Sequence, residues 1–142
     1  MLFSLGYEGL TVESFVTKLT TNRISLVIDV RLTPVSRKKG FSKTPLSRSL
    51  LTSEINYLHL PKLGNPKDNR AIFQTKEIEL GRERYYKHLN NGSRQAFEDV
   101  AKFASLQRFA ILCFEQDYKV CHRSCIAEQI QFEYPSIPIE HL

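Results

Sequence analysis

Residues 25–30 read SLVIDV, a nearly continuous apolar run rich in branched side chains. Such a run is typical of a central strand covered on both faces, because a parallel strand between two layers of helices presents no face to water. Asp29 lies near the end of the run, and Arg31 follows directly after it. The stretch therefore predicts a buried strand whose end carries charged side chains.

Segments of strand type and of helix type alternate on both sides of this run. The apolar patterns predict strands at residues 2–6, 25–30, 56–60, 109–114 and 137–142. Apolar spacing, caps and breakers predict helices at residues 11–23, 45–54, 77–90, 94–106 and 122–133. Between the third strand and the next helix, Pro61, Gly64, Asn65 and Pro66 predict an irregular, turn-rich segment. Strands that alternate with helices of this length pair in parallel through right-handed crossovers. We therefore expect an α/β fold, a three-layer sandwich with a mainly parallel open sheet of about five strands.

Length and composition are those of one globular unit. The chain has 142 residues, with 42% hydrophobic and 25% charged residues, so we expect a single α/β domain over residues 1–142. The first ten residues lack the pattern of a signal peptide, and no apolar run approaches the roughly 18 residues of a membrane span. The cysteines are odd in number and lie in one short segment, which suits reduced thiols. These features predict a cytoplasmic protein without membrane contact.

Positive charge is concentrated in one part of the chain. Residues 31–53 contain no acidic residue and these basic ones: Arg31, Arg37, Lys38, Lys39, Lys43 and Arg48. The other 14 basic residues are balanced by 15 acidic ones, so the net charge of +5 comes from this segment. Pro34 and Gly40 interrupt any periodicity in its first half, which predicts a loop. We call residues 31–48 the basic loop, and its charge predicts an anionic partner.

Polar residues follow each of the first four predicted strands. Ligands of an open parallel sheet bind in the crevice outside the carboxyl ends of its strands, so these residues are candidates for one composite site. They are Tyr7, Glu8, Asp29, Arg31, Gly64, Asn65, Cys113 and Glu115. Glu8, Asp29 and Glu115 are the candidate catalytic acids and bases. The alternative is structural: Asp29 and Arg31 would form an ion pair, and Glu8 and Glu115 would cap helices or face solvent.

Cys121, His122 and Arg123 stand at the predicted start of a helix, where backbone donors and the helix dipole favour an anion. The same field would lower the pKa of a thiol, which makes Cys121 a candidate nucleophile and Arg123 a contact for phosphate or carboxylate. The alternative is a small buried cysteine beside a capping histidine. Cys125, one turn later, is assigned to core packing.

Cys113, Cys121 and His122 also carry the donor atoms that zinc prefers. Their spacing lacks the paired C-x-x-C or H-x-x-x-H pattern of structural zinc sites, and adjacent residues diverge when both lie in a helix. The sequence therefore predicts no metal site, and whether these residues bind a metal stays open. It also identifies no cofactor.

Four blocks of the chain carry a family resemblance. They are GYEGLTVESF (6–15), IDVRLTPVSRKKGFSK (28–43), YLHLPKLGNPK (57–67) and LCFEQDYKVCHRSCIAE (112–128). In this order they resemble the family known as domain of unknown function 488, which has no assigned activity. The resemblance implies that the family's signature residues include, besides the strand-end residues above, Gly6, Gly9, Arg37, Phe41, Ser42, Cys121, His122 and Arg123.

Two functions fit these observations. The first is an enzyme, a hydrolase or transferase, acting on a phosphorylated or nucleotide-like ligand at the carboxyl edge of the sheet. Its ligand-binding residues would be Tyr7, Arg31, Arg37, Phe41, Ser42, Gly64, Asn65, His122 and Arg123. The alternative is a nucleic-acid-binding module in which the basic loop follows phosphates and Phe41 or Tyr7 stacks on a base. The expected partner is thus an anionic small molecule or a nucleic acid, and the oligomeric state stays open.

Overall fold

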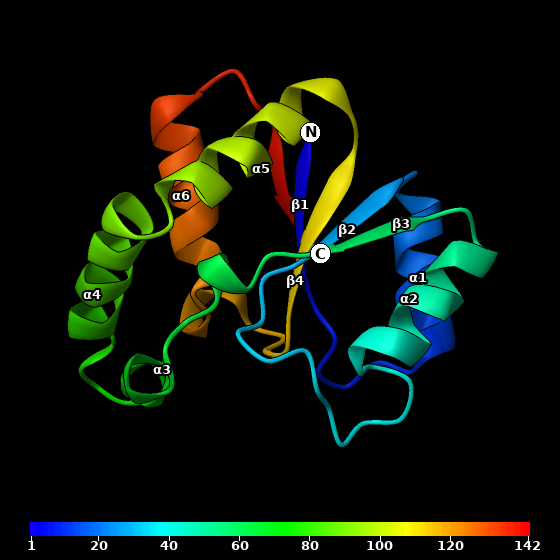
Figure 1. Cartoon of the computed structure of the whole chain (residues 1–142), viewed down its shortest axis with the longest axis horizontal. Coiled ribbons are helices and arrows are strands. Elements are labelled where there is room, and N and C mark those ends of the chain that lie inside the picture. The colour runs from blue at the N-terminus through cyan, green and yellow to red at the C-terminus, as the bar shows by residue number, and fades with distance from the viewer.

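One sheet runs through the middle of the molecule, with helices on both sides (Figure 1). The computed structural model describes all 142 residues. The strands are β1 (Leu2–Gly6), β2 (Leu26–Asp29), β3 (Asn56–His59), β4 (Phe109–Cys113) and β5 (Ile139–His141). The helices are α1 (Val12–Thr21), α2 (Lys43–Thr52), α3 (Lys67–Phe73), α4 (Ile78–Asn91), α5 (Arg94–Leu106) and α6 (Arg123–Glu133). Two single 3-10 turns, η1 (Pro61–Leu63) and η2 (Tyr118–Val120), complete the list.

The five strands are all parallel, in the order β3-β2-β4-β1-β5. The strand quoted first, β2, lies between β3 and β4, as a run buried on both faces requires. β4 occupies the centre, because Phe109 stands opposite Leu2 of β1 on one side and opposite Leu26 of β2 on the other. The predicted α/β fold with a mainly parallel sheet of about five strands is confirmed.

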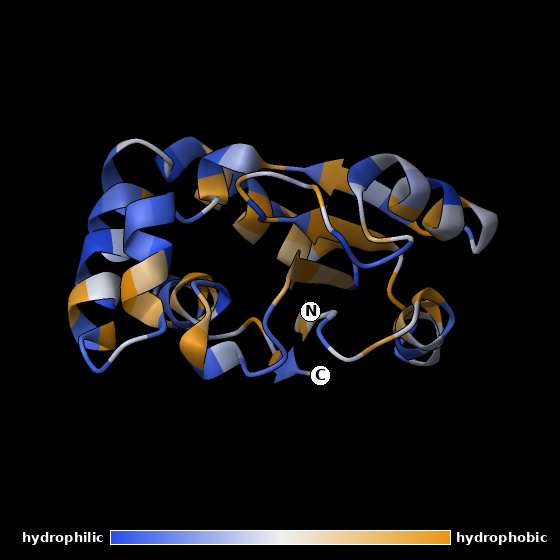
Figure 2. Cartoon of the chain, turned by 90° about the horizontal axis from the view of Figure 1, so that it is seen from below, coloured by the Kyte–Doolittle hydropathy of each residue, from blue (hydrophilic) through white to orange (hydrophobic).

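Side chains that alternate along the strands form two separate apolar cores. Leu26 and Ile28 of β2 face α4, α5 and α6, whereas Val27 between them faces α1 and α2. Seen from below, most strands of the sheet are hydrophobic, and they lie between helices in which hydrophobic and hydrophilic residues are mixed (Figure 2). The layers are therefore helix, sheet and helix, as expected for a three-layer sandwich.

Local sequence explains where α1 begins. Thr11 caps the helix through its side chain, which accepts the N–H of Ser14 at 3.1 Å, and Ser14 returns a contact to the N–H of Thr11 at 3.0 Å. This reciprocal pair satisfies two backbone donors that the first turn leaves free. Phe15 and Leu19 then bury one face of the helix against the sheet.

The segment after β3 differs from the sequence prediction. Residues 61–66 are irregular as expected, but α3 follows them at Lys67–Phe73, directly behind Pro66. The helix is anchored by Asn69 and Phe73, which are buried against α4. The absence of a side chain at Gly81 of α4 allows the Phe73 ring to pack closely against that helix. A Cβ atom at Gly81 would stand only 2.9 Å from the ring. The helix was missed because its seven residues are few and follow two prolines.

None of the helices has both the length and the apolar character needed to cross a membrane.

Candidate functional site

A pocket of about 460 Å³ opens at the carboxyl ends of β1, β2 and β4. The chain leaves β1 and β2 toward α1 and α2 on one face of the sheet, but leaves β4 toward α6 on the other face. Neighbouring strands whose connections depart on opposite faces leave a crevice between them, which is where ligands of open α/β sheets bind. The strand ends contribute Tyr7, Arg31 and Cys113 to the lining, and the start of α6 contributes His122.

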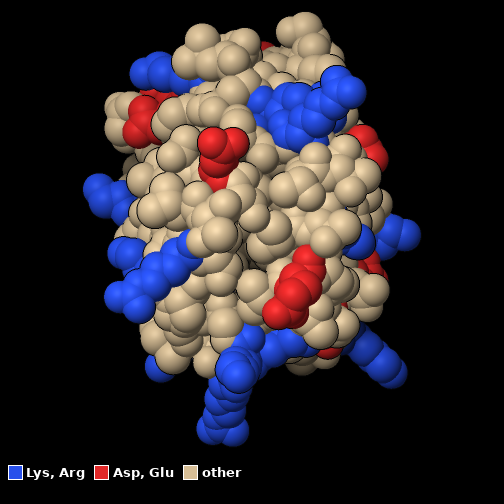
Figure 3. All heavy atoms as spheres, turned by 90° about the vertical axis from the view of Figure 1, so that its right-hand side faces the viewer, with Lys and Arg blue, Asp and Glu red and all other residues tan.

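The pocket is lined by four basic residues and by no carboxylate. They are Arg31, Arg37, Lys67 and Arg70. Arg37 and Lys67 are exposed and belong to none of the ion pairs of the molecule. Several Lys and Arg side chains extend from the lower end of the molecule in Figure 3, the end at which the strands lead into this crevice. An excess of uncompensated positive charge around one concave surface favours an anion there.

Asp29 and Arg31 form a buried ion pair in the wall of the pocket. Arg31 donates from Nη2 to the Asp29 carboxylate at 2.6 Å and from Nε at 2.9 Å, and Tyr57 donates its hydroxyl to the same carboxylate at 2.6 Å. This pairing raises the pKa of Arg31, although burial alone would lower it. Asp29 has no exposed surface and does not line the pocket. This is the structural ion pair that the sequence analysis gave as the alternative to a catalytic Asp29. The pair holds the Arg31 side chain in place.

Arg31 keeps little capacity to bind a ligand directly. Its Nη1 donates to the Phe41 carbonyl oxygen at 2.8 Å and to the Tyr7 hydroxyl at 3.2 Å. With Asp29 included, one N–H of the guanidinium is left without a partner. The Tyr7 hydroxyl, in contrast, accepts from Arg31 and still has its own proton to donate.

Tyr7 and Phe41 are not available to stack on a base. Phe41 has no exposed surface and Tyr7 is 3% exposed, and the two rings stack on each other with centroids 4.4 Å apart. The stacking role predicted for them is therefore wrong, because each ring face is already covered by protein. Tyr7 nevertheless forms part of the lining of the pocket.

Ser42 of the basic loop and Gly64 and Asn65 of the β3 connection have contacts within the protein. Ser42 does not line the pocket; its hydroxyl accepts the N–H of Ser36 at 3.0 Å and so closes the loop on itself. Gly64 also lies outside the lining, and a Cβ atom there would stand 2.4 Å from the Leu32 backbone. Asn65, its neighbour, does line the pocket and accepts an N–H from Asn69 of α3 at 2.9 Å.

Glu8 and Glu115 line a second, shallower hollow of about 320 Å³ beside the pocket. Arg70 and Phe114 belong to both cavities and separate them. Glu115 is 7% exposed and accepts from Arg70 at 3.2 Å. Burial alone would raise the pKa of Glu115, but its own backbone N–H and Arg70 hold it below the usual value. The predicted single site is thus divided, with these carboxylates beside the pocket and not in its lining.

Arg123 lies behind the pocket, not in its lining. It is 1% exposed, and its guanidinium donates to Ser4 Oγ at 2.9 Å and to the Glu115 carbonyl oxygen at 2.8 Å. A third contact runs to Cys121 Sγ at 3.6 Å. Direct contact of Arg123 with a ligand, as predicted from its place at the helix start, is not supported by this burial.

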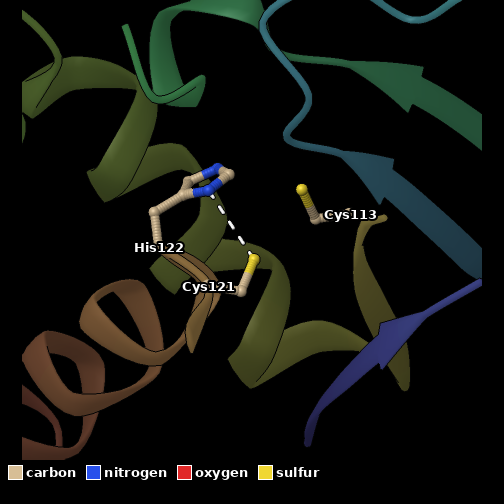
Figure 4. A group of neighbouring side chains, drawn as sticks. All are labelled: Cys113, Cys121 and His122. Carbon is tan, nitrogen blue, oxygen red and sulfur yellow. Dashed lines mark hydrogen bonds between the residues drawn. The ribbon is translucent and has the colours of Figure 1, made fainter. Parts of the chain in front are cut away.

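Cys113, Cys121 and His122 form a compact buried group at the floor of the pocket (Figure 4). A hydrogen bond with Cys121 and the neighbouring His122 ring lower the pKa of Cys113. Burial and the nearby Cys113 sulfur raise the pKa of Cys121 well above its usual value. The lowered pKa expected for Cys121 is therefore wrong: the residue precedes α6, is 2% exposed and shares its surroundings with a second thiol. Cys125 is fully buried in the core, as the sequence predicted.

Lys67 and Arg70 are the basic residues of the pocket that sequence reasoning missed. Both lie on α3, which places them over the crevice from the side opposite the basic loop. Two features of the sequence could have identified them. Proline commonly stands at the start of a helix, as Pro66 does here, and Arg70 follows Lys67 by about one helical turn. A larger hollow, of about 620 Å³, lies on the outer side of α4, but it contains none of the strand-end residues.

Comparison with other proteins gives one match. Neither the curated proteins nor the solved structures contain a significant match to this chain. A family model, described as "Domain of unknown function DUF488", matches residues 11–130, which include the basic loop, α3 and the group at the floor of the pocket. The chain belongs to the DUF488 family, as its four sequence blocks predicted.

Proposed function

We propose that the protein is an enzyme, a hydrolase or transferase, that acts on a phosphorylated or nucleotide-like ligand bound in the pocket at the carboxyl edge of the sheet. One observation carries the proposal: four cations and no carboxylate line a pocket at the topological switch point of the sheet. Its volume of about 460 Å³ lies within the range of roughly 300–1,000 Å³ typical of small-ligand sites. In this proposal the protein acts in the cytoplasm, where its three free thiols stay reduced.

The exposed cations Arg37 and Lys67 would bind the anion from opposite sides of the pocket, with Arg70 behind them. The Tyr7 hydroxyl and the Asn65 amide would orient the ligand, since each is held by a protein contact on one side. Charge-assisted contacts of this kind stabilise phosphate oxygens more strongly than neutral hydrogen bonds. Tyr7, as a proton donor beside these cations, is the candidate for protonating a leaving oxygen.

The binding step is tested by titrating inorganic phosphate and AMP into the full chain by calorimetry at low salt. Lys67→Ala and Arg37→Ala should each weaken binding roughly tenfold or more, because a hydrogen bond to a charged group contributes about 1.5–3 kcal/mol. Lys18→Ala is the matched control, since it removes the same charge from an exposed side chain on α1, away from the pocket. Equal losses in all three variants would mean that general charge, not this pocket, attracts the anion.

The nucleic-acid alternative has a different signature. A module that neutralises several phosphates binds single-stranded oligonucleotides with a steep salt dependence, whereas a pocket for one small anion does not. Oligonucleotide binding that falls steeply with salt, together with no AMP binding, would replace the enzyme proposal by the alternative. Catalysis itself is tested by phosphate release from nucleoside and sugar phosphates. Tyr7→Phe is expected to reduce turnover much more than binding, because it removes the proposed proton donor but leaves the cations in place.

A further inference from the structure

We infer that Cys113, Cys121 and His122 form a binding site for one divalent metal ion of the zinc type, with an open coordination position toward the pocket. The donor atoms of the three residues all lie within 4.8 Å of one another. In Figure 4 the two sulfur atoms and the imidazole ring point toward one common space. The inference does not depend on the proposed function, because metal content is measured without any substrate.

Backbone conformation explains why adjacent residues converge here. Cys121 is extended, with φ −130° and ψ 143°, whereas His122 is already helical, with φ −59° and ψ −15°. The change of conformation between them turns both side chains to the same side, which two consecutive helical residues could not do. Cys113 approaches from the end of β4.

The spacing of the donors fits tetrahedral zinc. Zinc binds sulfur at about 2.3 Å and nitrogen at about 2.0–2.1 Å, so two such ligands on a tetrahedron stand roughly 3.6 Å apart. The observed distance from Cys121 Sγ to His122 Nδ1 is 3.7 Å. Two sulfur donors and one nitrogen donor also suit zinc and other borderline-soft metals better than magnesium or calcium.

His122 is oriented as metal-binding histidines are. Its Nε2 lies 3.0 Å from the carbonyl oxygen of Val30, which can only accept, so Nε2 carries the proton. The neutral ring therefore has its lone pair on Nδ1, the nitrogen that faces the sulfur atoms. A histidine that donates its other N–H to a backbone carbonyl is the usual outer contact of a zinc ligand.

Arg123 supplies a complementary charge. Its guanidinium is 1% exposed, has no carboxylate partner and lies 3.6 Å from Cys121 Sγ. A buried cation without a counter-charge is costly, and a metal-bound thiolate beside it would offset that cost. Hydrogen bonds to the sulfur ligands are a common feature of metal–thiolate sites.

The fourth position would be reached from the pocket, because Cys113 and His122 form part of its lining. Glu115 lies next to both thiols. Its Oε2 is buried without any hydrogen-bond partner, so it is ready to accept from a water at the open position. Three protein ligands with an open fourth position are the pattern of catalytic zinc sites.

The test is metal analysis of the full chain, purified without a histidine tag from zinc-supplemented cells. We expect about one zinc per chain in the native protein and in Cys125→Ala, and almost none in Cys113→Ser or Cys121→Ser. Cys125→Ala is the matched control, because Cys125 is a buried cysteine outside the group. Circular dichroism checks that each variant is folded.

A second measurement needs no variant. Chelator-treated native protein is titrated with Co²⁺, which should give the visible bands of tetrahedral coordination and a sulfur-to-metal charge-transfer band, both lost on adding zinc. Native protein without zinc and without these bands would overturn the inference. Unchanged zinc content in folded Cys113→Ser would also overturn it, as would a Cys113–Cys121 disulfide in place of metal in protein purified without reductant.

Discussion

Replacing Asp29 by alanine is expected to lower the free energy of unfolding by about 3–5 kcal/mol, because it leaves the Arg31 guanidinium buried without its counter-charge. Arg31 is 5% exposed and receives its only ion pair from Asp29. The loss is a large part of the roughly 5–15 kcal/mol that stabilises a typical domain. Urea denaturation of the native chain and of the variant, followed by circular dichroism, measures the difference.

Two further variants separate the buried charge from the lost hydrogen bonds. Tyr57→Phe removes one hydrogen bond to Asp29 and should cost only about 1 kcal/mol. The double variant Asp29→Ala with Arg31→Met should be more stable than Asp29→Ala alone, since it removes the unpaired charge. A double variant as unstable as the single one would contradict this account of the wall of the pocket.

Gly6→Ala is the second change with a large expected effect. A Cβ atom at Gly6 would stand 1.7 Å from the carbonyl oxygen of Glu115, a backbone atom that cannot rotate away. Overpacking typically costs about 1–3 kcal/mol, and a collision with backbone should lie at the upper end of that range or above it. The same carbonyl accepts from Arg123 at 2.8 Å, so the change should also disturb the group at the floor of the pocket.

Gly92→Ala is the matched control for this prediction. Gly92 follows α4 in a right-handed helical conformation, and a Cβ atom there meets no other atom within 4 Å. Its effect on the free energy of unfolding should be neutral or stabilising by up to about 1 kcal/mol, because alanine restricts the unfolded chain. The two glycine variants are compared by urea denaturation and by zinc content. If Gly6→Ala proved as stable as Gly92→Ala, the close approach of β1 to the Glu115 backbone would be refuted.

The order of strands and helices was predictable because each long element carries its own apolar period. SLVIDV and FAILCF have the length and the apolar content of buried strands, and the face of α1 that bears Phe15 and Leu19 is visible in the spacing of its residues. The order β3-β2-β4-β1-β5 was not predictable, because pairing of strands far apart in the chain leaves no local pattern. α3 was missed because prolines and a glycine dominate the segment before it.

The candidate site was predictable in position but not in detail. Residues after parallel strands must gather at one edge, and Tyr7, Arg31 and Asn65 do line the pocket there. Whether a strand-end side chain enters the pocket depends on which face of the sheet it points to. It also depends on contacts with residues that are distant in the sequence and become neighbours only in the folded chain. The Asp29 carboxylate is hydrogen-bonded to Arg31 and Tyr57 and so does not face the pocket. Arg123 is hydrogen-bonded to Ser4 and is buried behind the pocket.

The position of β4 between β1 and β2 has a consequence for how the chain folds during synthesis. β1 and β2 are not paired with each other; β4 (Phe109–Cys113), which begins more than a hundred residues after Leu2, lies between them and pairs with both. A nascent chain that ends before residue 109 therefore holds two apolar strands that lack their central partner, and the β2–β3 pair is the only strand pair of the sheet that it can form. Such long-range pairing slows folding and leaves strand edges exposed until it is complete. Until β4 has left the ribosome, the edges of β1 and β2 that it covers in the folded protein are open to pairing with other chains.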